Sequence, residues 1–160
     1  LINEGKLGGF HFNDSKYGDD DLTVGSINPY QLFLIFNELI EGMDAKNMNH
    51  ATGLAWMIDA SHNIKDPLED LLQSIEAIQI AYAQALLVNT KALQIAQQNN
   101  DVVTAQEILQ TAFRTDVRPL VAEARLQAGG ALAPITLFRQ QKIREKLIRA
   151  RGEKNIATGL

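Results

Sequence analysis

The sequence predicts an α/β fold in which parallel strands alternate with helices. Two short apolar segments, residues 7–12 and 54–58, are bounded by glycine and polar residues and are typical of buried strands. Each is followed by a longer segment whose apolar residues recur at helical spacing. Because a helix that joins two buried strands forms a crossover, we expect the strands to pair in parallel, with helices packed outside.

The helices have recognisable start signals. The pair Asn-Pro at 28–29 combines an N-cap residue with proline at the first helical position, and an apolar stripe continues to about residue 44. The pair Asp-Pro at 66–67, with Glu69 in the capping-box position, predicts a second helix that extends to about residue 99. Further helical patterns cover residues 101–114, 116–127 and 136–151.

Composition narrows the class of protein. The chain has 160 residues, of which 46% are apolar and 21% charged, as in a soluble globular domain with a real core. The absence of cysteine excludes disulfides and thiolate metal sites, so any metal would be held by His, Asp and Glu. A net charge of −4 argues against a nucleic-acid partner. With no apolar run of membrane-spanning length, we expect no membrane partner, and the lack of cysteine fits an expected cytoplasmic location.

Two strands are too few for a parallel sheet that is buried on both faces. The chain begins with Leu1 rather than Met, and no signal peptide is visible. We therefore expect this chain to be part of a longer polypeptide whose upstream residues supply further strands.

Unusual polar residues stand at the carboxyl ends of both predicted strands, where α/β barrels carry their active sites. His11 lies in the first strand and Asp59 follows the second. Between them runs an acidic loop, residues 13–25, in which Asp19 and Asp21 are two apart. In an extended loop their carboxylates share one side, and that of Asp20 faces the other. Imidazole and carboxylate ligands together suit Mn²⁺, Mg²⁺, Co²⁺ or Zn²⁺.

Each of these residues also has a plainer interpretation. A lone histidine in an apolar strand is more often a core residue, and a run of three aspartates is more often a solvated loop. His62, beside Asp59, fits a pocket or a surface loop equally well, whereas His50 and Trp56 are expected to be structural. A strand-end histidine, an Asp-x-Asp pair and a strand-end aspartate together favour a site.

Two long blocks carry a resemblance to a known family. GGFHFNDSKYGDDDLTVGSINPYQLFLIFNEL, residues 8–39, and WMIDASHNIKDPLEDLLQSIEAIQ, residues 56–79, resemble the carboxyl-terminal part of bacterial L-rhamnose isomerases, most closely the branch with broad aldose–ketose specificity. The resemblance implies a (β/α)₈ TIM barrel. Residues 1–100 would form its last βα units, and residues 101–160 a helical carboxyl-terminal extension.

The same resemblance implies a site with two divalent ions, Mn²⁺ being the first expectation and Co²⁺, Zn²⁺ or Mg²⁺ the alternatives. His11 and Asp59 would bind the structural ion, and Asp19 and Asp21 the catalytic one. Asp59 would also transfer a proton through a metal-bound water, and Ser61 would contact substrate at the pocket edge. The ions would act as Lewis acids on the open-chain sugar while hydride moves between C1 and C2, converting L-rhamnose to L-rhamnulose.

The family is tetrameric, so we expect a homotetramer. Its remaining metal ligands and its catalytic lysine lie on earlier strands. We therefore expect this chain alone to be inactive and to bind metal weakly.

Two other functions fit parts of the sequence. A metal-dependent phosphodiesterase or endonuclease barrel also places His and carboxylates at strand ends, but it would need basic residues near the metals. A non-catalytic helical interaction module would leave the aspartate run as mere surface. The basic residues cluster instead in the tail, where we expect a solvated helix face or a contact with an acidic neighbouring subunit: Arg139, Lys142, Arg144, Lys146, Arg149, Arg151 and Lys154.

Overall fold

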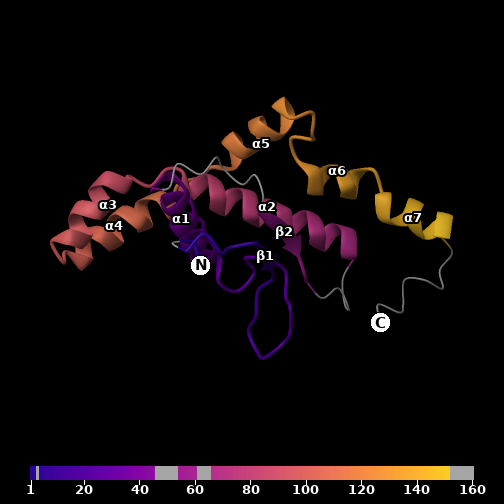
Figure 1. The fold of residues 1–160 in the computed structure, drawn as a ribbon. Coiled ribbons are helices and arrows are strands. Elements are labelled where there is room, and N and C mark those ends of the chain that lie inside the picture. The colour runs from indigo at the N-terminus through magenta and orange to yellow at the C-terminus, as the bar shows by residue number, and fades with distance from the viewer. Residues whose placement is uncertain (3, 46–53, 61–65, 152–160) are drawn as a thin grey trace.

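The computed structural model describes residues 1–2, 4–45, 54–60 and 66–151. It is a mixed α/β structure, as predicted, with a small parallel sheet and many helices (Figure 1). In chain order the elements are β1 (Gly9–Phe12), α1 (Pro29–Ala45), β2 (Ala55–Ile58), α2 (Pro67–Ala85), α3 (Thr90–Gln98), α4 (Val102–Phe113), α5 (Arg118–Gln127), α6 (Pro134–Gln140) and α7 (Ile143–Arg151).

The two strands pair in parallel, which confirms the expected crossover through α1. Gly9 lies opposite Ala55 and His11 opposite Met57. A β-carbon at Gly9 would lie 2.5 Å from the carbonyl oxygen of Ala55, so this close approach requires glycine. The arrangement is that of two adjacent strand–helix units and is consistent with the carboxyl-terminal part of a longer barrel.

The sheet has two different faces because side chains alternate along each strand. Phe10 and Phe12 lie on one face, where both stack on Trp56 at ring-centroid distances of 5.5 and 5.8 Å. Phe12 is buried, while Trp56 packs as expected but stays 40% exposed. His11 and Met57 occupy the opposite face, the one away from the aromatic cluster.

The main core lies behind the aromatic face of the sheet. Helix α1 packs against α2, and α3 packs against α4. Phe33 of α1 is fully buried, and its ring lies 5.6 Å from that of Phe113 at the end of α4. Small residues of α2, Ala81 and Ala85, belong to the same core and allow the helices to approach closely.

The predicted helix from residue 66 to about residue 99 is wrong, because α2 ends at Ala85 and α3 begins at Thr90 after a bend of 68°. The side chain of Asn89 accepts a hydrogen bond from the amide of Ala92 at 3.1 Å and so starts a new helix. The bend brings Leu93 into the main core. No single helix among the described residues is long and apolar enough to cross a membrane, and the bent pair α2–α3 meets that test only in combined length and composition.

The predicted helix over 136–151 is also interrupted. Helix α6 ends at Gln140 and α7 begins at Ile143, with Lys142 between them at φ 49°. A left-handed residue breaks the helical hydrogen-bond pattern, so the last segment is a pair of short helices rather than one.

The first turn of α2 binds the basic tail. Asp66 caps the helix, as predicted, by accepting hydrogen bonds from the amides of Leu68 and Glu69 at 3.0 and 3.1 Å. The side chain of Glu69 accepts a hydrogen bond from the Arg139 Nε at 2.8 Å, and Arg144 forms an ion pair with Asp66 at 3.4 Å. Both arginine side chains stay more than half exposed, at 60% and 55%, so they form ion pairs with α2 while remaining on the solvated helix face that the sequence predicts.

Candidate functional site

The strand ends bring His11 and Asp59 together. The Nδ1 of His11 lies 3.6 Å from the Oδ2 of Asp59. His11 is opposite Met57, and Asp59 stands two residues beyond Met57, so both side chains share one face of the sheet. The amide of Asp59 donates to the carbonyl of Phe12 at 2.9 Å and extends the ladder to this residue. The predicted meeting of these two side chains is confirmed.

Both members of the pair are open to solvent. The side chain of His11 is 61% exposed and that of Asp59 is 67% exposed. A small cavity of about 310 Å³ lies beside His11, between β1, the start of the acidic loop and α1. Polar side chains of Asn13, Asp14 and Asn28 contribute to its lining.

The acidic loop is bent rather than extended. Its base is closed by two backbone hydrogen bonds between Asp14 and Leu22, of 2.9 and 2.6 Å. Gly18 and Asp21 have left-handed φ angles of 56° and 39°. The expected extended geometry is therefore wrong, because a closed loop of this length must reverse direction.

The three consecutive aspartates have different surroundings. Asp20 accepts hydrogen bonds from the amides of Tyr17 and Lys16 at 3.0 and 3.2 Å, and these bonds, that of Tyr17 foremost, hold its pKa below the ordinary value. Asp21 accepts a hydrogen bond from the Asn13 side chain at 2.8 Å. Asp19 is exposed. Asp20 thus stabilises the loop itself.

The structure does not gather all four predicted metal ligands. Within the described part of the chain, no group of three or more His, Asp or Glu side chains is placed so that it could hold a metal ion. His11 and Asp59 meet, whereas Asp19 and Asp21 stand apart from them in the loop. Ser61, His62 and His50 lie outside the described residues.

The pair nevertheless offers donor atoms of the kind that a divalent ion takes from two of its ligands. Two ligands each about 2.1 Å from one ion, at octahedral to tetrahedral angles, lie roughly 3.0–3.4 Å apart. The 3.6 Å between His11 and Asp59 needs only a small side-chain rotation to reach this value. An imidazole nitrogen with a carboxylate oxygen suits Mn²⁺, Co²⁺ or Zn²⁺. The remaining coordination positions would need further ligands.

The chain is similar to probable sugar isomerases. It is 52% identical over 149 residues to a probable sugar isomerase of Mesorhizobium japonicum and, to the same extent, to one of Rhizobium meliloti. The match covers 92% of this chain, and the chain spans about a third of the length of these relatives, 34% in each case. No family model matches the chain.

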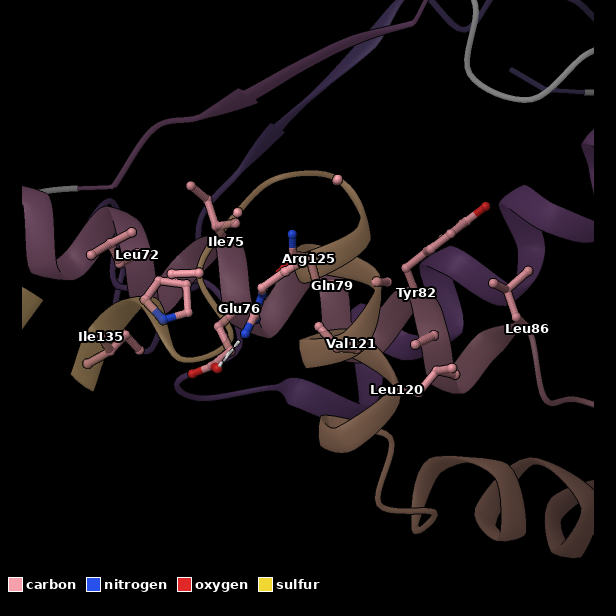
Figure 2. A pocket seen from close by; sticks show the side chains of 16 residues that line it. Leu72, Ile75, Glu76, Gln79, Tyr82, Leu86, Leu120, Val121, Arg125 and Ile135 are labelled. Carbon is pink, nitrogen blue, oxygen red and sulfur yellow. Dashed lines mark hydrogen bonds and ion pairs between the residues drawn. The ribbon is translucent and has the colours of Figure 1, made fainter. Parts of the chain in front are cut away.

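A larger, mostly apolar groove of about 530 Å³ lies elsewhere, between α2, α5 and the segment that leads into α6 (Figure 2). Arg125 reaches from α5 toward α2, where it donates to Gln79 at 2.7 Å and pairs with Glu76 at 3.4 Å. The apolar lining of the groove includes Leu72, Ile75, Tyr82, Leu86, Leu120, Val121 and Ile135. With its charged groups paired and no histidine in its lining, the groove does not resemble a metal centre.

The sequence analysis missed the residues that hold the acidic loop in place. Thr23, at the end of the loop, donates a hydrogen bond to Asp70 of α2, and the amide of Val24 donates to Ser74 at 3.2 Å. The available signal was the stripe of small or polar residues at helical spacing in α2, which includes Asp70, Ser74 and Ala81. A stripe of that kind marks a helix face in close contact with other backbone.

Proposed function

We propose that this chain contributes two strand ends to a metal-dependent aldose–ketose isomerase that converts L-rhamnose to L-rhamnulose and acts on related sugars. The observation that carries the proposal is the pairing of His11 with Asp59 at the carboxyl ends of two adjacent parallel strands. The similarity to probable sugar isomerases supports the reaction class. The choice of sugar rests on the resemblance of residues 8–39 and 56–79.

The reaction moves one hydride between C1 and C2 and one proton between the two attached oxygens. Two divalent ions, Mn²⁺ by preference, would stabilise the negative charge that develops on the sugar oxygens. His11 would supply an imidazole nitrogen to one ion and Asp59 a carboxylate oxygen. In this proposal Asp59 would also assist the transfer of the proton between the two sugar oxygens, as the resemblance implies.

The face that carries the pair also supplies an apolar wall. Met57 lies opposite His11 in the ladder and is 45% exposed on the same face. An apolar side chain beside the reacting carbons excludes water, which protects a migrating hydride from exchange. Because His11 and Asp59 are more than half exposed, the active enzyme needs further cover over this face. We propose that other strands of the same barrel, in a cytoplasmic homotetramer, provide it.

In this proposal Asp19 and Asp21 hold the second ion. This assignment rests on the resemblance of residues 8–39, since hydrogen bonds within the loop reach Asp21 as well as Asp20. The rival phosphodiesterase reaction gains no support from the basic tail, since Arg139 and Arg144 bind carboxylates of α2.

The test is an assay of the native protein with L-rhamnose and Mn²⁺, with ketose formation as the readout. We expect turnover that a chelator abolishes and Mn²⁺ restores. Asp59→Asn should remove at least 99% of the activity, roughly the loss typical for an essential proton-transfer group, while the circular dichroism spectrum stays unchanged. Asp116→Asn, an exposed carboxylate between α4 and α5, is the matched control. Hydrolysis of a phosphodiester without any sugar turnover would contradict the proposal.

A further inference from the structure

The buried contact between α2 and the end of the acidic loop has a role that goes beyond packing. We propose that Asp70 is a positioning residue, which with Thr23 and Ser74 sets the place of the Asp19 and Asp21 carboxylates relative to the His11–Asp59 pair. This inference rests on the proposed function, because only a metal site requires that the two sets of ligands keep a fixed relation.

The contact is completely enclosed. Asp70 is 1% exposed, Ser74 0%, Thr23 6% and Val24 2%. Asp70 and Ser74 are four residues apart, so they stand on one face of α2, one turn above the other. That face accepts two hydrogen bonds from consecutive loop residues, a hydroxyl bond from Thr23 and a backbone amide bond from Val24.

A carboxylate is an unusual choice for such a place, because removing a charge from water is costly unless hydrogen bonds or charges compensate it. Asp70 lies in the first turn of α2, where the helix dipole favours a negative group. The start of the helix is therefore a favourable place for a carboxyl group that accepts the hydrogen bond from the Thr23 hydroxyl.

The hydrogen bond between Thr23 and Asp70 acts directly on the base of the acidic loop. Thr23 follows Leu22, which is bonded in both directions to Asp14 and closes the loop at its base. Within residues 15–21 the loop is stiffened by its own bonds, including that of the Ser15 hydroxyl to the Gly18 carbonyl at 2.9 Å. A stiff loop fixed at its base moves as a unit, so its base contacts decide where its carboxylates lie.

The contact also joins the two halves of the proposed site. The loop follows β1, which carries His11, whereas α2 follows β2, which is extended by Asp59 (Figure 1). Asp70 and Thr23 are separated by 47 residues in the chain. A shift of β2 and α2 would therefore move the loop as well, so the relative position of the two sets of ligands would be kept.

The experiment uses Thr23→Val and Asp70→Asn in the native protein. Thr23→Val is nearly isosteric and removes only the hydroxyl, so it decides the question even where Asp70→Asn fails to fold. Asp116→Asn is the matched control. Two readouts are taken: backbone hydrogen exchange of residues 15–22 without metal, and Mn²⁺ titration by calorimetry.

We expect Thr23→Val to speed exchange of the loop amides about tenfold, as the loss of one buried hydrogen bond would. Exchange within α2 should stay unchanged. In the titration the second Mn²⁺ should bind about tenfold more weakly or worse, while the first changes less than about twofold, the pattern of a residue that orients ligands. Asp70→Asn weakens the acceptor of the same bond and should likewise speed exchange of the loop amides.

Equal weakening of both ions, or loop exchange and second-ion affinity within about twofold of the parent for Thr23→Val, would overturn the positioning role. A native protein that binds no Mn²⁺ would overturn the proposed function and, with it, the metal part of this inference. Loop exchange that still depends on Thr23 would in that case show the contact to be a structural anchor only. The two failures are therefore distinguishable.

Discussion

Asp14 offers the clearest quantitative test of how the strand end is built. Its carboxylate is 9% exposed and accepts hydrogen bonds from the amides of Ile27 and Asn28, both at 2.8 Å. A third bond comes from the amide of Ser15 at 3.0 Å. Asp14 thus ties the end of β1 to the residues that lead into α1, and its own backbone closes the acidic loop.

Replacing Asp14 by alanine leaves these amides without their acceptor. A hydrogen bond to a charged group contributes about 1.5–3 kcal/mol. Ile27 and Asn28 are exposed, so water replaces part of the loss, and each of the three bonds then contributes about 1 kcal/mol or somewhat less. We expect Asp14→Ala to lower the free energy of unfolding by about 2–3 kcal/mol. Asp14→Asn, which keeps one acceptor oxygen, should cost about half as much.

The assay is urea unfolding of the native protein, followed by circular dichroism at helical wavelengths. The midpoint should fall in the order parent, Asp14→Asn, Asp14→Ala, with an unchanged slope against urea. A loss below about 0.5 kcal/mol for Asp14→Ala, the range of ordinary surface substitutions, would refute the reasoning. So would an asparagine variant that is as unstable as the alanine variant.

Three further predictions test other parts of the structure. Hydrogen bonds from Arg118 lower the pKa of Asp116 to about 2, so Arg118→Ala should raise that pKa toward 3.8 in a carboxylate NMR titration, and an unchanged titration would contradict the pairing. Because folding lowers this pKa, the pair stabilises the protein above about pH 3.8 and loses its effect as the pH falls through about 2. Asn89→Ala removes the cap of α3 and should destabilise that helix by about 1 kcal/mol, seen as faster amide exchange over residues 90–98, whereas Asn99→Ala at its other end should have a smaller effect. L-rhamnose deuterated at C2 should give a ketose that keeps the label at C1, because the proposed mechanism transfers hydride directly; wash-out into water would point to an enediol.

Much of the local structure could be predicted because its determinants are local. The Asn-Pro and Asp-Pro pairs fixed the starts of α1 and α2, and the two apolar segments became β1 and β2. The meeting of His11 and Asp59 followed from parallel pairing, since side-chain alternation places both on one face. These outcomes depend on periodicity and capping, which a single sequence carries.

The rest depended on tertiary contacts that no local pattern encodes. The break between α2 and α3 places Leu93 in a core built from distant residues, which overrides a continuous helical pattern. The acidic loop is shaped by the Asp14–Leu22 closure and by the contact between Thr23 and Asp70. The division at residue 100 stays a prediction, although α3 and α4, on either side of it, pack against one another.

The central claim is that His11 and Asp59 hold one divalent ion together. Its most direct test is pulsed electron paramagnetic resonance of the native protein loaded with Mn²⁺. We predict a nitrogen hyperfine signal from coordinated imidazole that His11→Ala diminishes, and Mn²⁺ affinity that both His11→Ala and Asp59→Asn reduce at least about tenfold, as the loss of a metal ligand requires. An unchanged nitrogen signal and unchanged affinity in both variants would contradict the account.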